Sequence, residues 1–120
     1  MALPDDDTPV LLHNPRCSKS RAALALLEER GVAFETRLYL EAPLSREELE
    51  DLQGRLGRPV AEWTRTGESA FTDAGLEKGA AADAILDAMA AQPILMERPI
   101  LVRGPSARVG RPPDDILELL

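Results

Sequence analysis

The first forty residues have the pattern of a strand, a helix and a second strand. Residues that favour a turn follow the first strand, and a residue that favours a helix end follows the helix. A short apolar run, Val10–His13, is followed by an Asn-Pro pair that favours a turn. Residues 18–30 carry the apolar positions of a helix, and Gly31 is typical of a helix end. Residues 32–40 then roughly alternate apolar and polar side chains. Since parallel strands need a long crossover between them, this unit predicts an α/β domain with a parallel pair.

The rest of the chain continues this alternation of elements. Ser45 and Glu48 form an S-x-x-E capping box, which predicts the start of a second helix. The later elements are expected to be short helices and loops over residues 60–79, a helix over 80–92, a strand over 99–103, a hairpin partner over 108–110 and a last helix from Pro112. The order is β-α-β-α-α-β-β-α. We expect one domain over residues 10–120, preceded by a flexible leader of residues 1–9.

Composition excludes several classes of partner. The 120 residues carry a net charge of −7 and only 3% aromatic side chains, which argues against nucleic acid and anionic membranes as partners. The acidic N-terminus lacks the apolar core of a secretory signal, and no apolar run is long enough to span a bilayer. A single cysteine allows no internal disulfide, so we expect a cytoplasmic protein. Nothing indicates an obligate interface or a metal site, and we expect a monomer without bound metal.

Basic residues are concentrated in two segments of this acidic chain. Residues 14–27 hold three basic side chains and no acidic one, and residues 95–113 hold four basic side chains against Glu97 alone. Two interpretations stay open on charge alone. The segments are either ordinary surface scatter or parts of a local anion site on an acidic protein.

Cys17 is the strongest candidate for chemistry. It lies at the predicted start of the first helix, where unpaired backbone N–H groups and the helix dipole favour an anion. Arg16, Lys19 and Arg21 add positive charge, and all of these effects favour the reactive thiolate. The alternative is a buried cysteine that acts as a small apolar residue. Because Ser20 occupies the last position of a C-x-x-S pattern, turnover at Cys17 would need an external thiol.

The cysteine segment resembles a known family. Residues 13–21, HNPRCSKSR, resemble the H-N-P-x-C-x-x-S-R signature of the glutaredoxin-coupled arsenate reductases, the ArsC family. Three later segments are similar to that family in the same order: LYLEAP at residues 38–43, ERPILV at residues 97–102 and the Arg-Pro pair at residues 111–112. The resemblance runs from about residue 10 to residue 120. It is loose between Arg65 and Asp83.

The resemblance implies a thioredoxin-like fold with a central mixed sheet flanked by helices. It also implies that Cys17 is the nucleophile and that Arg65, Arg98 and Arg111 bind an oxyanion. The Arg98–Pro99 bond is expected to be the fold's cis-proline bond. His13 aligns with a histidine that tunes the pKa of the family's cysteine.

The neighbours of Cys17 in the loop and first helical turn are further candidates. Asn14, Ser18 and Ser20 are expected near the substrate, where they shape the loop or donate hydrogen bonds to the thiolate. For Ser20 a role at the helix start stays equally open.

The family implies arsenate reductase activity. Cys17 would attack arsenate, glutathione would serve as co-substrate, and glutaredoxin would complete the reduction to arsenite, with no cofactor bound. Two alternatives stay open. One is a glutathione-dependent thiol reductase of the same fold. The other is a regulator similar to Spx, which binds RNA polymerase and senses oxidation through C-x-x-C, although Ser20 removes that switch.

Overall fold

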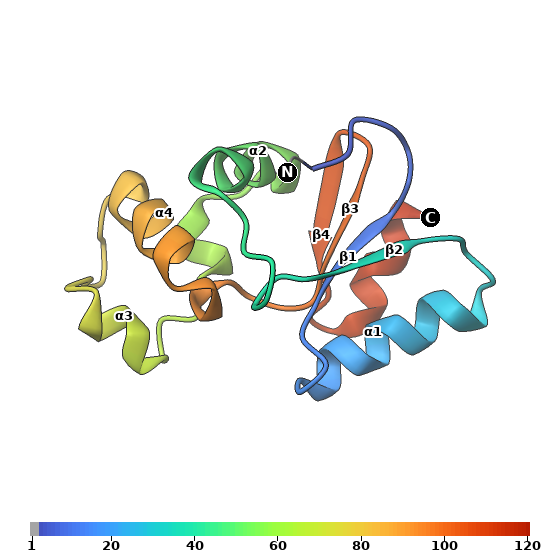
Figure 1. The fold of residues 1–120 in the computed structure, drawn as a ribbon, viewed down its shortest axis with the longest axis horizontal. Helices are drawn as coiled ribbons and strands as arrows, with labels where there is room; N and C mark the ends of the chain where they lie inside the picture. The colour runs from blue at the N-terminus through green and yellow to red at the C-terminus, as the bar shows by residue number, and fades with distance from the viewer. Residues whose placement is uncertain (1–2) are drawn as a thin grey trace.

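The computed structural model describes residues 3–120 and is built around one four-stranded sheet (Figure 1). Its strands are β1 (Val10–His13), β2 (Glu35–Leu38), β3 (Ile100–Arg103) and β4 (Ser106–Val109), in the spatial order β2-β1-β3-β4. β1 and β2 run parallel, whereas β3 is antiparallel to both β1 and β4. The mixed sheet and the parallel first unit predicted from the sequence are therefore confirmed.

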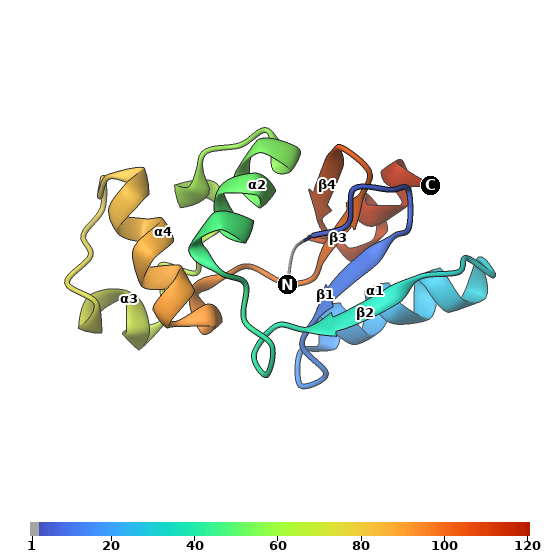
Figure 2. The same ribbon diagram turned by 45° about the horizontal axis from the view of Figure 1, so that its top comes forward.

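Helices occupy both faces of the sheet and form a separate lobe beside it. They are α1 (Ser18–Glu29), α2 (Arg46–Leu56), α3 (Ser69–Asp73), α4 (Ala82–Ala91) and the 3-10 helices η1 (Val60–Trp63), η2 (Pro93–Leu95) and η3 (Pro113–Leu119). Figure 2 shows α3 and α4 beyond α2, away from the strands. Within residues 3–120, no helix combines the length and apolar character needed to cross a membrane.

Two apolar layers sandwich the central strands. Because side chains alternate across a strand, Leu11 of β1 faces α1 and η3, and Leu12 packs in the opposite layer with α2. Both leucines are fully buried. Burial on both faces explains why β1 is a continuous apolar run rather than an alternating one.

The end of α1 explains why β2 is shorter than predicted. Gly31 adopts φ +65° and donates to Glu28 O at 3.1 Å, while Val32 N donates to Leu27 O at 3.3 Å. This pair of bonds is a Schellman motif, which needs a left-handed residue. The N–H of Val32 therefore closes the helix instead of joining the sheet. Pairing starts at Glu35, which lies opposite the first residue of β1.

The segment preceding β1, expected to be a flexible leader, contacts the rest of the domain near its start. Leu3 is only 4% exposed and belongs to the main apolar core. Arg55 of α2 donates from Nη1 to Pro4 O at 2.8 Å and to Gly104 O at 2.9 Å. One apolar side chain and one carbonyl thus join residues 3 and 4 to the domain, and the flexibility expected of residues 3–9 stays a prediction. The part of that expectation that concerns residues 1–2 lies outside the described residues.

Candidate active site

Cys17 occupies the N-cap position of α1, directly after the turn that follows β1. Its backbone N–H donates to Asn14 O at 3.0 Å, and Arg16 N donates to the Asn14 side-chain oxygen at 3.0 Å. Asn14 therefore shapes the loop through both its backbone and its side chain, an arrangement typical of Asx turns. The cysteine side chain itself is half-buried.

The two serines near Cys17 have different surroundings. Ser20 is fully buried, and its hydroxyl accepts a hydrogen bond from Asn14 N at 3.3 Å. That contact anchors the loop to the first turn of α1. Ser18 is exposed as the first residue of α1. Ser20 therefore holds the loop, whereas Ser18 faces solvent at its rim.

Several groups act on the Cys17 thiol. Partial burial raises its pKa, but the backbone N–H groups of Ser20 and Lys19 and the guanidinium of Arg98 lower it, and the net pKa is below the usual value. The N–H contribution is the helix-start effect expected from the sequence. The sequence predicted that basic side chains of the loop itself, among them Arg21, would favour the thiolate. The Arg21 guanidinium instead turns back and donates to Pro15 O at 2.9 Å. The guanidinium that lowers the pKa of the thiol belongs to Arg98, which lies just before β3.

His13 ends β1 beside this loop and is 5% exposed. Burial and the nearby charge of Arg21 lower the pKa of its imidazole, which favours the neutral ring. Its buried Nδ1 has no hydrogen-bond partner among residues 3–120. His13 also lines a pocket of about 230 Å³ with Asn14, Leu40 and other residues. The proposed tuning of Cys17 by His13 stays a prediction.

Three arginines from distant parts of the chain line one pocket of about 480 Å³. Arg65 follows η1, Arg98 precedes β3 and Arg111 follows β4. The pocket wall is formed by an isolated bridge between Thr64 and Met96, in which Arg65 N donates to Leu95 O at 2.7 Å. The structure thus brings together the three arginines that the resemblance had grouped.

The same region contains the two cis peptide bonds of the described chain. The Arg98–Pro99 bond is cis, as the resemblance implied, and the Arg111–Pro112 bond is cis as well. Arg111 donates from Nη1 to Arg98 O at 3.2 Å. The segment before β3 and the segment after β4 are therefore joined at the pocket.

Two carboxylates share the pocket with the arginines. Glu68 forms an ion pair with Arg65. Glu97 lies 3.4 Å from Arg98 Nη1 through Oε1 and 3.8 Å from Arg111 Nε through Oε2. The sequence reasoning noted Glu97 only as a charge and did not identify Glu68. An acidic residue next to the Arg-Pro pair was the available signal for Glu97.

Tyr39 is a further residue that sequence reasoning used only as part of a motif. It is 1% exposed, and burial raises the pKa of its phenol, while Arg98, Arg65 and the Asn14 side chain oppose that shift. Cys17 raises the pKa further. These influences place the phenol close to both the cysteine loop and the arginine pocket.

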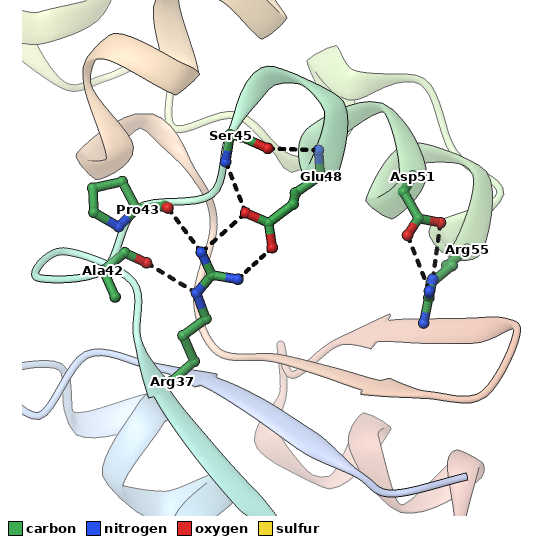
Figure 3. A network of polar contacts seen from close by, with 7 residues as sticks. All are labelled: Arg37, Ala42, Pro43, Ser45, Glu48, Asp51 and Arg55. Atoms are coloured by element: carbon green, nitrogen blue, oxygen red, sulfur yellow. Dashed lines mark hydrogen bonds and ion pairs between the residues drawn. The ribbon is translucent and has the colours of Figure 1, made fainter. Parts of the chain in front are cut away.

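The chain after Tyr39 is held by a buried polar network around Arg37 (Figure 3). Arg37 donates to Ala42 O at 2.9 Å and to Pro43 O at 2.8 Å, and it pairs with both carboxylate oxygens of Glu48. Glu48 also accepts from Ser45 N at 3.0 Å, which completes the predicted capping box. We call these contacts the Arg37–Glu48 clamp. It fixes the loop that carries Leu40 to the wall of the His13 pocket.

The site therefore combines the Cys17 thiol with a pocket lined by three arginines. Arg98 joins them, because it acts on the Cys17 sulfur and lines the pocket with Arg65 and Arg111. Planar guanidinium groups bind oxyanions through paired hydrogen bonds. In the described part of the chain, no cluster of three or more His, Cys, Asp or Glu is arranged to hold a metal ion.

Comparisons with known proteins agree with this arrangement. The sequence profile of the ArsC family matches residues 12–119. The chain is 45% identical over 112 residues to an arsenate reductase of Neisseria meningitidis, covering 92% of this chain and 96% of that protein. It is 37% identical over 113 residues to an arsenate reductase of Haemophilus influenzae, covering 92% and 97%.

A solved structure shows the same fold. The arsenate reductase from Vibrio cholerae superimposes with a TM-score of 0.89 at 44% identity, covering 96% of this chain and 99% of that one. The mixed four-stranded sheet with its helices matches the thioredoxin-like fold of these structural relatives. The chain belongs to the ArsC family.

Proposed function

We propose that this protein is an arsenate reductase whose nucleophile is Cys17. The observation that carries the proposal is the position of Arg98, which acts on the Cys17 thiol and lines the three-arginine pocket. An oxyanion held by Arg65, Arg98 and Arg111 would lie beside the sulfur. The arginines would offset the repulsion between a thiolate and an anion, and they would stabilise the charge of the transition state.

The first step is an attack of the Cys17 thiolate on arsenic. A sulfur–arsenic bond forms and an arsenic–oxygen bond breaks, and the departing oxygen takes up a proton and leaves as water. Arsenic stays in the +5 state in this step. The product is an anionic thiol adduct, which the same three arginines would hold.

Reduction needs two thiols from outside the chain, since Cys17 is its only cysteine. We propose that glutathione attacks the adduct and that glutaredoxin reduces the resulting mixed species and releases arsenite. Across the cycle arsenic gains two electrons, and one glutathione thiol and one glutaredoxin thiol lose them as a mixed disulfide. Cys17 returns as a thiol, and no bound cofactor takes part. A reducing cytoplasm would supply both thiols.

The test is arsenate-dependent oxidation of NADPH, coupled through glutathione, glutathione reductase and glutaredoxin. Wild type should turn over only when arsenate, glutathione and glutaredoxin are all present, and Cys17→Ala should lose turnover. Ser106→Ala is the control, because Ser106 pairs with Arg103 at the β3–β4 turn and lines neither the His13 pocket nor the arginine pocket. Full turnover by Cys17→Ala would refute the mechanism. Loss of arsenate turnover in wild type, with rapid formation of a Cys17–glutathione disulfide, would favour the thiol reductase instead.

A further inference from the structure

Glu97 lies where a negative charge opposes the binding of an anion. Its two carboxylate oxygens approach two different arginines, Arg98 Nη1 at 3.4 Å and Arg111 Nε at 3.8 Å. An oxyanion that binds to these same two arginines shares them with the Glu97 carboxylate. Glu68 differs, because the arginine that it pairs with is Arg65.

The backbone keeps Glu97 at this position. Its N–H donates to Trp63 O at 3.0 Å, next to the bridge that joins Thr64 and Met96. Trp63 is fully buried, so the attachment point of Glu97 belongs to the rigid wall of the pocket. The carboxylate cannot withdraw by a shift of the backbone without breaking this wall.

Chemistry limits which oxyanions can share the pocket with a carboxylate. An ionised carboxylate only accepts hydrogen bonds, so an oxygen that carries a proton meets it favourably. A bare anionic oxygen at the same place meets a like charge and offers the carboxylate no proton to accept. Near neutral pH, arsenate and phosphate each keep at least one proton on oxygen, whereas sulfate keeps none.

Arg98 supplies a second sign that this corner is a binding position. Its Nε is buried and has no hydrogen-bond partner among residues 3–120. Buried donors are almost always satisfied by protein, water or ligand. A bound oxyanion that accepts from Arg98 would share this guanidinium with the Glu97 carboxylate.

We infer that Glu97 is a specificity-determining residue that admits protonated oxyanions and rejects fully ionised ones such as sulfate. The inference rests on the proposed function, because it concerns the oxyanion pocket of that reaction. A site that hydrogen-bonds an O–H group of its ligand strongly rejects a similar ligand that lacks this group. An apolar pocket discriminates less strongly between ligands of different shape. Glu97 would thus protect the pocket from an abundant anion that cannot be reduced by thiols.

The experiment measures how well arsenate, phosphate and sulfate each protect Cys17 from alkylation by iodoacetamide, at pH 7 and constant ionic strength. In wild type, arsenate and phosphate should protect at concentrations at least about tenfold lower than sulfate does. In Glu97→Gln, the amide can donate to sulfate, so this preference should fall by about tenfold. Glu118→Gln is the control, since Glu118 pairs with Arg108 at 2.9 Å outside the pocket. It should keep the wild-type preference.

The outcomes separate this inference from the proposed function. If Glu97→Gln binds all three anions more tightly but keeps the wild-type preference among them, Glu97 only competes with anions for the arginines. That result would refute the role of Glu97 in specificity and would leave the proposed oxyanion pocket intact. If neither arsenate nor phosphate protects Cys17 in folded wild type, the oxyanion pocket fails and the selection with it. Thermal unfolding of each variant verifies that the protein is folded in every measurement.

Discussion

Arg98 is the residue that connects the Cys17 thiol to the three-arginine pocket. Its guanidinium lowers the pKa of Cys17 and contacts Glu97, and its carbonyl accepts a hydrogen bond from Arg111. A single side chain thus connects the thiol to the charges expected to hold the substrate. Substitutions of Arg98 can therefore test separately the effect of its charge on the thiol and the effect of its planar guanidinium on anion binding.

Removing the charge of Arg98 should raise the pKa of the Cys17 thiol. Arg98→Ala removes a positive charge that favours the thiolate, so the pH profile of iodoacetamide alkylation should move to higher pH and the rate at pH 7 should fall. Arg98→Lys keeps the charge but loses the planar fork, so it should keep most of the thiolate and bind arsenate more weakly. Arg108→Ala is the control. An unchanged pH profile in Arg98→Ala would contradict the assignment.

The sequence predicted the influences on the Cys17 thiol better within its own loop than across the sheet. Unpaired N–H groups at a helix start are a local property, so the effect of Ser20 N and Lys19 N on Cys17 could be anticipated. Arg98 reaches the sulfur only through the sheet topology, and the resemblance, not the charge pattern, indicated it. Glu97 escaped notice because a carboxylate beside an arginine has the same sequence pattern as a surface ion pair.

At the scale of elements, the Arg37–Glu48 clamp connects β2 to α2 and shapes the loop between them (Figure 3). The side chains of Arg37 and Glu48 are 10% and 6% exposed. Burial raises the pKa of Glu48, but the bonds from Arg37 and Ser45 outweigh it and hold the pKa below its usual 4.5. An ionised, buried and fully bonded pair is costly to break from one side.

Truncating one partner of the clamp should destabilise the whole domain. Arg37→Ala leaves the Glu48 carboxylate buried without its cation, and such losses typically cost about 3–5 kcal/mol. The free energy of unfolding, measured by urea titration, checks this. Arg58→Ala is the control, because its ion pair with Glu62 at 3.2 Å is exposed and such pairs are worth about 1 kcal/mol or less. Equal effects of the two variants would mean that the clamp is not buried in solution.

Element boundaries were predictable where a local signal marks them. Gly31 and Gly57 adopt φ of +65° and +64° at the ends of α1 and α2, and Ser45 caps α2 as its sequence pattern indicates. The start of β2 could not be read in this way, because it depends on where β1 begins across the sheet. The residue at which two strands begin to pair depends on both strands, so the sequence of β2 alone does not show where its pairing starts.

At the scale of the whole molecule, contacts between distant segments hold the sheet and the helical lobe together. The segment before β1 lies between α2 and the β3–β4 turn, since Arg55 donates to both Pro4 O and Gly104 O. Leu3 packs in the main core, which continues from the sheet into the helical lobe. The acidic sequence of residues 1–9 predicts a flexible leader, and the burial of Leu3 offers a way to test this prediction for residues 3–9.

Leu3→Ala should therefore reduce the stability of the domain although it lies near the chain end. Leucine-to-alanine changes in cores cost about 2–5 kcal/mol, and a site close to a terminus relaxes more easily, so we expect about 2 kcal/mol. Leu120→Ala is the matched control, because Leu120 is 41% exposed and its loss should cost well under about 1 kcal/mol. Urea unfolding followed by circular dichroism measures both. If Leu3→Ala matches Leu120→Ala, residues 3–9 do not pack on the domain in solution, and the remaining protein partners of Arg55 are then Asp51 and Gly104 O.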